Sequence, residues 1–215
     1  GKSDIQIQGS TATIDGSIVG GTIYVDINKD GVAQSDEIVG TSSAVGRVDY
    51  VVDLTKLDSN SDGAFTVGES RAVLSGGTDI DTNLSYHIDL YGPAGSSVIT
   101  PFTSLLQPLL EGGMEFQVAN QLLVDRLGLP QGSDLLSLNP LVSSIQVLGQ
   151  NASVMTLAIQ LSEIYAHQSG VTDVHSSFDV FSAIGRALVD LPGGQVVDFA
   201  DQSLYGRISA ELQLP

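Results

Sequence analysis

The spacing of apolar residues along the chain changes near residue 100. Before that point apolar and polar side chains alternate, as in the run Val48, Tyr50, Val52 and Leu54. Successive side chains of a strand point to opposite faces, so a period of two predicts strands with one buried face each. Clusters of Gly, Ser, Asp and Asn separate these short runs, and residues 1–99 are therefore predicted to form a β-sandwich. The same alternation occurs at Ile5 and Ile7, at Ile23 and Val25, and at Leu84, Tyr86, Ile88 and Leu90.

After residue 100 the apolar period becomes helical. The segment TPFTSLLQPLL predicts a helix that Thr100 caps and in which Pro101 takes the first position. Apolar stripes at helical spacing, such as Phe178, Phe181, Ile184 and Leu188, are typical of a side that faces the core. Further helices are expected at about 114–127, 152–168, 176–190 and 195–212, with breakers such as GLPQGSD and LPGGQ between them.

The chain is thus predicted to belong to the α+β class, with the N-terminal β-sandwich at residues 1–99 and a C-terminal helical bundle subdomain at residues 100–215. The apolar segment SVITPFTSLLQPLL crosses the boundary between them. A free linker would be polar. We therefore expect the helical subdomain to dock on the sandwich.

Two stretches of the strand-rich half have the spacing of a calcium-binding loop: DINKDGVAQSDE at 26–37 and DSNSDGAFTVGE at 58–69. Such a loop of twelve residues supplies oxygen ligands from positions 1, 3, 5, 7, 9 and 12, with a glycine at position 6 for the sharp turn. The first loop would use Asp26, Asn28, Asp30, the carbonyl of Val32, Gln34 or a water beside it, and Glu37. The second would use Asp58, Asn60, Asp62, the carbonyl of Ala64, Thr66 or its water, and Glu69.

Two complete matches predict Ca²⁺ at both loops, although one match alone could be a polar turn. The residues around the first loop, GGTIYV before it and IVGTSS after it, favour strands over helices. The loops are therefore predicted to be EF-hand-like in their ligands only, and their role to be structural, since a strand-flanked loop does not open a groove between helices. A third cluster, Asp79, Asp81 and Asn83, favours a solvated turn, with a shared or third ion site as the alternative.

The balance of charge agrees with a cation-binding protein. The chain has 25 acidic and 8 basic residues, a formal net charge of −17, which argues against nucleic acid and anionic membrane surfaces as partners. Solubility alone is the competing explanation of this charge. The chain has no cysteine, so thiolate metal sites and disulfides are excluded. No apolar run is long enough to insert into a membrane, and the N-terminal GKSDIQIQGS lacks the core of a signal peptide, so we expect a mature or excised segment.

The stretch GTIYVDINKDGVAQSDE resembles the strand and calcium loop of the prealbumin-like B domains in serine-aspartate repeat surface proteins. A longer pattern over residues 10 to 142, with LSGGTDIDTN, LYGPAGSSVITPFTSLL and LGLPQGSDLLSLNPL, is similar to modules of very large bacterial surface and RTX-type adhesins. This resemblance implies an exported, calcium-stiffened module of a cell-surface or biofilm-matrix protein that leaves the cell by a type I system. The glycine-aspartate nonapeptide repeats of RTX proteins are absent from the sequence, which leaves the export route open.

No common catalytic motif occurs in the chain: neither a metalloprotease H-E-x-x-H, nor a hydrolase G-x-S-x-G, nor a phosphate-binding loop. The histidines His87, His167 and His175 stand apart from one another in the sequence, which favours structural or surface roles. The protein is therefore predicted not to be an enzyme.

The sequence favours a calcium-stabilised structural or adhesive module of a secreted bacterial protein, located outside the cell or on its surface. Its expected partners are neighbouring modules or copies of itself, and self-assembly is one form of this prediction. The alternative is a calcium-dependent head that binds a carbohydrate or a peptide. A dockerin-like module is a third reading, against which the strands around both loops count.

Overall fold

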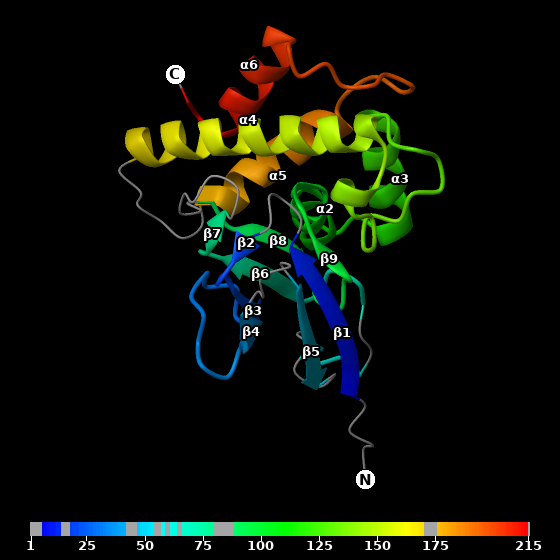
Figure 1. Ribbon diagram of the computed structural model, residues 1–215. Helices are drawn as coiled ribbons and strands as arrows, with labels where there is room; N and C mark the ends of the chain where they lie inside the picture. The colour runs from blue at the N-terminus through cyan, green and yellow to red at the C-terminus, as the bar shows by residue number, and fades with distance from the viewer. Residues whose placement is uncertain are drawn as a thin grey trace.

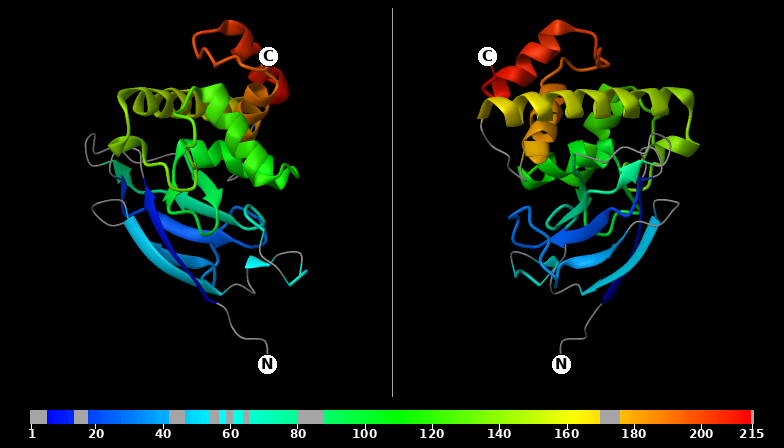
Figure 2. Two further views of the ribbon diagram at one scale, coloured as in Figure 1. Left: turned by 90° about the vertical axis from the view of Figure 1, so that its right-hand side faces the viewer. Right: turned by 60° about the vertical axis from the view of Figure 1, so that its left-hand side comes forward.

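The computed structural model describes residues 6–13, 18–41, 47–53, 57–58, 61–63, 66–79, 88–169 and 176–214. The strands come from the first half of the chain and gather at one end of the molecule, while the helices of the second half gather at the other (Figures 1 and 2). The predicted α+β class is confirmed. The finer prediction of a β-sandwich, and the boundary between 1–99 and 100–215, stay predictions.

The described strands pair in three sheets. A four-stranded antiparallel sheet has the order β4-β3-β6-β8, a three-stranded sheet has the order β5-β1-β9, and β2 pairs with β7. In the three-stranded sheet β1 is antiparallel to β5 and parallel to β9. The strands are β1 (Gln6–Thr13), β2 (Ile18–Val19), β3 (Thr22–Asp26), β4 (Ile38–Thr41), β5 (Arg47–Asp53), β6 (Arg71–Ser75), β7 (Thr78–Asp79), β8 (Leu90–Pro93) and β9 (Val98–Ile99).

The middle of the four-stranded sheet is buried on both faces. In β3, Ile23, Tyr24, Val25 and Asp26 are all at most 2% exposed, and the first four residues of β6 are buried as well. The prediction of one buried face per strand was therefore wrong for β3. Alternation in sequence identifies a strand, but a central strand that is covered on both faces buries the side chains that point to either face.

Helix α2 (Pro101–Glu111) follows directly after β9 and is buried along ten consecutive residues, Pro101 to Leu110. As predicted, Thr100 caps it: the Thr100 hydroxyl accepts from the backbone N–H groups of Phe102 and Thr103, and the Thr103 hydroxyl accepts from Thr100 N–H in return. This reciprocal arrangement satisfies N–H groups that an uncapped helix would leave without partners.

The buried polar residues of α2 complete the edge of the sheet. On the edge strand β8, Tyr91 donates its N–H to Ser104 Oγ over 2.9 Å, and its carbonyl accepts from Thr103 Oγ1 over 2.7 Å. A Cβ at Gly92 would lie 3.0 Å from Thr103 Oγ1, so glycine permits this close approach. An open strand edge can pair with a further strand. Helix α2 covers the edge of β8 and so closes this side of the sheet.

Four more α-helices and a short 3₁₀ turn complete the described chain. Helix α5 lies at the centre and packs against α2, α3, α4, α6 and β8, with Val180, Phe181, Ile184 and Leu188 fully buried. One apolar cluster runs from the strands through α2 and α5 to the remaining helices. These elements are α3 (Phe116–Leu127), η1 (Pro140–Val142), α4 (Ile145–Ser169), α5 (Ser176–Val189) and α6 (Gln202–Glu211).

Two helices begin elsewhere than the sequence predicts. Helix α4 starts at Ile145 and runs through Gly149, because Gln146 and Gln150 bind the carbonyls of Gly128 and Leu127 at the end of α3. Helix α6 starts only at Gln202, where the Asp201 side chain accepts from Ser203 N–H and caps it. Tertiary contacts in the first case and a cap in the second outweigh the apolar pattern.

A substitution of Phe181 in α5 tests the packing of helices on strands. The Phe181 ring meets the ring of Tyr91 in β8 edge-on, at a centroid distance of 6.3 Å. Phe181→Ala should lower the free energy of unfolding by about 3–5 kcal/mol, the usual cost of a cavity at a fully buried phenylalanine. Denaturant unfolding measures it. In the control Val142→Ala, at a side chain 81% exposed, the change should stay within about 0.5 kcal/mol. Equal effects of the two substitutions would contradict the central position of Phe181.

Candidate metal centre

Loop 1 (26–37) begins with the last residue of β3 and ends directly before β4, and loop 2 (58–69) ends two residues before β6. The two loops bend in the same way at the same positions. The fourth residue has a positive φ in both, 57° at Lys29 and 58° at Ser61, and so has the glycine at the sixth position, 72° at Gly31 and 83° at Gly63. These left-handed residues curl the backbone inward.

The curled backbone orients the first aspartate of each loop. The N–H groups of Asp30 and Gly31 donate to the two carboxylate oxygens of Asp26 over 3.1 and 2.9 Å. In loop 2 the N–H groups of the corresponding residues, Asp62 and Gly63, donate to Asp58 over 3.1 and 2.8 Å. The equivalence of the two sets shows that the shared sequence spacing produces a shared local structure.

The last residue of each loop is also held by the backbone. Gln34 N–H donates to Glu37 Oε1 over 3.4 Å, and Thr66 N–H donates to Glu69 Oε2 over 3.2 Å. In loop 1 a further N–H, that of Ile27, donates to Glu37 Oε2 over 2.7 Å. The distal glutamate is thereby brought back to the start of its loop.

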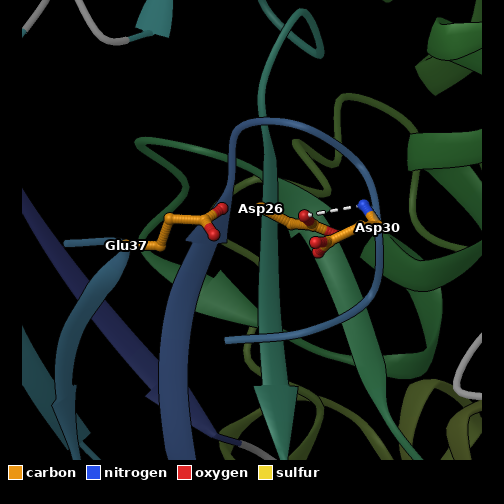
Figure 3. Close-up of side chains that lie close together, drawn as sticks. All are labelled: Asp26, Asp30 and Glu37. Atoms are coloured by element: carbon orange, nitrogen blue, oxygen red, sulfur yellow. Dashed lines mark hydrogen bonds between the residues drawn. The ribbon is translucent and has the colours of Figure 1, made fainter. Parts of the chain in front are cut away.

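As a result, the three carboxylates of each loop converge. Each of Asp26, Asp30 and Glu37 offers an oxygen within 4.8 Å of the others, and so does each of Asp58, Asp62 and Glu69. Figure 3 shows the loop 1 carboxylates around one space inside the curl. Calcium holds its oxygens at about 2.3–2.6 Å, so oxygens on opposite sides of one ion lie about 5 Å apart. Both groups of acids could hold a metal ion.

The other residues predicted as ligands of loop 1 line the same curl. Asn28 and Gln34 donate from their side-chain amides to Asp30 Oδ2 over 3.0 and 2.6 Å. The amide oxygen Oε1 of Gln34 is buried and has no hydrogen-bond partner among the described residues. A buried acceptor without a donor fits a cation at this position. The side chain of Val32 is 51% exposed, and only its carbonyl was predicted to bind.

In loop 2 the structure describes Asp58, Asp62, Thr66 and Glu69, while Asn60 and Ala64 lie outside the described residues. Asp79 is part of β7, but Asp81 and Asn83, the rest of the third acidic cluster, also lie outside them. Of the histidines, only His167 is described, exposed in the last turn of α4.

Loop 1 holds Asp26 and Glu37 in a less polar environment than an exposed turn would. Asp26 is 0% and Glu37 4% exposed, and burial raises the pKa of both carboxyls above their ordinary values. The pKa of Asp30 is instead lowered, chiefly by the hydrogen bond from Val32 N–H. Two buried carboxylates so close together repel each other when ionised, and a bound cation would relieve that repulsion.

Sequence reasoning missed two residues beside loop 1, Arg71 and Glu111. Arg71 is 5% exposed at the start of β6, and its guanidinium binds Glu111 at the end of α2 through Nε and Nη2 over 2.9 and 2.6 Å. The guanidinium also approaches Asp26, with Nη1 4.0 Å from Oδ2. An arginine opening the apolar run RAVL was the available signal, because a charge inside a strand needs a partner.

Searches for similar proteins found no matching family model, no matching curated sequence and no matching solved structure. None of the helices in the described part of the chain combines the length and apolarity needed to cross a bilayer.

The loop conformation can be tested at Gly63, where an added Cβ would meet no atom within 4 Å. With no clash, Gly63→Ala should cost only backbone strain, about 1–2 kcal/mol of unfolding free energy. The matched control is Gly149→Ala in the interior of α4, where a Cβ likewise meets nothing and alanine should stabilise by about 0.5–1 kcal/mol. Denaturant unfolding in chelator measures both variants. A shift in the same direction for both would contradict the left-handed turn.

Asp89 provides a test by pH. It lies between β6 and α5, where its N–H donates to Ser177 Oγ, and burial raises its pKa from 3.8 to about 6 despite a hydrogen bond from the Ser75 side chain. The unfolded chain releases this proton near pH 4 and the folded chain near pH 6, so stability should fall as pH rises through that window, by up to about 3 kcal/mol.

Asp89→Asn keeps the shape of the side chain and cannot ionise. The unfolding free energy of this variant should therefore fall by less than that of the unsubstituted protein as pH rises from 4 to 6. Denaturant unfolding at a series of pH values, in chelator, makes the comparison. Parallel curves for the two proteins would show that Asp89 does not carry the effect.

Proposed function

We propose that loops 1 and 2 each bind one calcium ion and that the protein is a calcium-stabilised structural module. The observation that carries the proposal is the repeated arrangement of the two loops: the same bends, the same N–H groups on the first aspartate, and three carboxylates within 4.8 Å in each. Chance polar turns would not be expected to repeat all three features.

Calcium is favoured over other cations by the set of ligands. Each loop offers carboxylates, an amide or hydroxyl side chain and a backbone carbonyl, all hard oxygen donors, and calcium accepts six to eight of these in flexible geometry. Magnesium requires a stricter octahedron and gives up its waters reluctantly. In this proposal the loops are EF-hand-like in their ligands. The ion of loop 1 is held by the side chains of Asp26, Asn28, Asp30, Gln34 and Glu37 and by the carbonyl of Val32.

The proposed role is mechanical. Loop 1 joins β3 to β4, and loop 2 leads into β6, the neighbour of β3 in the same sheet. An ion in each loop would tie the ends of adjacent strands and stiffen a strand-rich half that we propose to be a β-sandwich. Calcium loops of extracellular modules bind with Kd near 10⁻⁴ to 10⁻³ M, roughly the calcium level outside cells and far above that of the cytosol. The proposal therefore includes a location outside the cell.

The wider role that we propose is that of a structural or adhesive module in a secreted bacterial surface or matrix protein, in contact with neighbouring modules or copies of itself. The alternative, a head that binds a glycan or peptide with the help of calcium, has one supporting feature. A cleft of about 730 Å³ lies between loop 2 and the α2–α3 turn, where Glu69 of the loop borders Leu110, Met114 and Phe116.

Calcium titration tests the metal sites. Calorimetry on the metal-free protein should give two bound ions, and saturation should raise the melting temperature, since a hundredfold excess over Kd contributes about 2.7 kcal/mol per site. Glu37→Gln and Glu69→Gln should each remove one ion. Asp36→Asn, an equal change of charge at an exposed residue of loop 1, should retain both.

The proposal fails if millimolar calcium produces neither binding heat nor a rise in melting temperature. It also fails if Asp36→Asn removes an ion as effectively as Glu37→Gln, because general acidity would then explain the binding. Magnesium in place of calcium serves as the control for the identity of the ion.

A further inference from the structure

The last turn of α2, Gln107 to Glu111, contacts both loops. Gln107 Nε2 donates to the carbonyl of Gly68 in loop 2 over 3.0 Å and to Glu111 Oε2 over 2.9 Å. A Cβ at Gly68 would lie 2.5 Å from side-chain atoms of Leu110, so the backbone of loop 2 packs directly on this turn. From loop 1, Lys29 Nζ lies 3.5 Å from Glu111 Oε1. The proposed metal loops thus contact the same turn of one helix, loop 2 at Gln107 and Leu110 and loop 1 at Glu111.

Arg71 is the link between this turn and loop 1. It is paired with Asp26 in the register of β6 and β3, and its guanidinium lies between Asp26 on one side and the two oxygens of Glu111 on the other. The guanidinium carbon is also 3.6 Å from the ring centroid of Phe178 in α5. Being almost fully buried, Arg71 cannot turn away to solvent without breaking these contacts.

In this position Arg71 would compete with the ion of loop 1 for the carboxylate of Asp26. Asp26 is the first ligand in the proposed site, so a calcium ion there would share the Asp26 carboxylate with a buried positive charge. Two cations beside one carboxylate repel each other, strongly so where water is excluded. The bidentate contact with Glu111 opposes this effect, since it supplies the guanidinium with an anion of its own.

We propose that Glu111 sets the calcium affinity of loop 1 by neutralising Arg71, so that occupancy of loop 1 and docking of the α2 end are thermodynamically coupled. The inference rests on the proposed function. The coupling is reciprocal: Glu111 strengthens binding at loop 1, and an ion in loop 1 strengthens the pair of Arg71 with Glu111, because Asp26 is then engaged by the metal. The helical half would therefore be held more firmly where calcium is plentiful.

The test uses the full chain carrying Glu69→Gln, so that loop 1 alone binds calcium. In this background Glu111→Gln should raise the calcium Kd about tenfold, through the uncompensated charge of Arg71. Adding Arg71→Met should return Kd to within about threefold of the starting value, which a merely disruptive Glu111 substitution would not allow. Glu163→Gln, at an exposed residue of α4, is the control for charge and should leave Kd unchanged. Calorimetry measures all four proteins.

A second measurement leaves Arg71 and Glu111 intact. In the Glu69→Gln protein, calcium should slow hydrogen exchange at the amides of residues 109–113 several-fold and leave α6 unaffected. If this protein binds no calcium, the proposed function of loop 1 fails and the inference fails with it. If it binds calcium, but Glu111→Gln leaves Kd unchanged, or Arg71→Met does not restore affinity, or exchange in α2 does not respond, the inference alone is overturned.

Discussion

The bidentate ion pair between Arg71 and Glu111 determines how the helices sit on the strands. Arg71 is 5% exposed, and a buried guanidinium is very costly without a partner. Its partners come from three places: Glu111 from α2, the ring of Phe178 from α5, and Asp26 from the neighbouring strand. Apolar packing alone would tolerate small shifts of α2 along the sheet. A shift of one turn would separate Glu111 from Arg71 and leave the buried guanidinium without its bidentate partner, so the pair favours one arrangement.

Helix α2 can occupy this position because each of its polar side chains makes at least one hydrogen bond. Thr103 and Ser104 bind the edge of β8 that faces away from β6, and Gln107 binds loop 2 and Glu111. A helix buried on every side is normally apolar all round, yet these residues replace the hydrogen bonds that water or another strand would otherwise make. The same side chains that close the sheet edge also fix the helix against the loops. The sheet, the loops and the helices are consequently parts of one packed unit.

The features that depend on residues close together in the sequence were predictable from it. The loop spacing identified the carboxylates that converge, and TPFTSLLQPLL identified α2 together with its cap, because twelve-residue loops and capping boxes are local. The pairing of Arg71 with Glu111 was not predictable, since forty residues separate the two. The parallel pairing of β9 with β1 depends on an even longer separation. The start of α4 was misplaced for the same reason, because contacts with α3 decide it, whereas the start of α6 was misplaced although its cap, Asp201, is local.

The two loops have the same local structure but different surroundings, and this difference suggests different roles. In loop 1, Asp26 and Glu37 are buried, and β3 and β4 fix both ends. In loop 2, Asp62 and Thr66 are exposed and Asp58 and Glu69 are half-buried. Burial strengthens the attraction of carboxylates for a cation, whereas the charge of Arg71 weakens it at loop 1 only. Loop 1 thus combines buried carboxylates with a nearby cation, Arg71, whose charge is neutralised by Glu111 of α2. If loop 1 binds calcium as proposed, its occupancy would therefore respond to α2, and the more exposed loop 2 meets the same helix through Gln107 and Leu110.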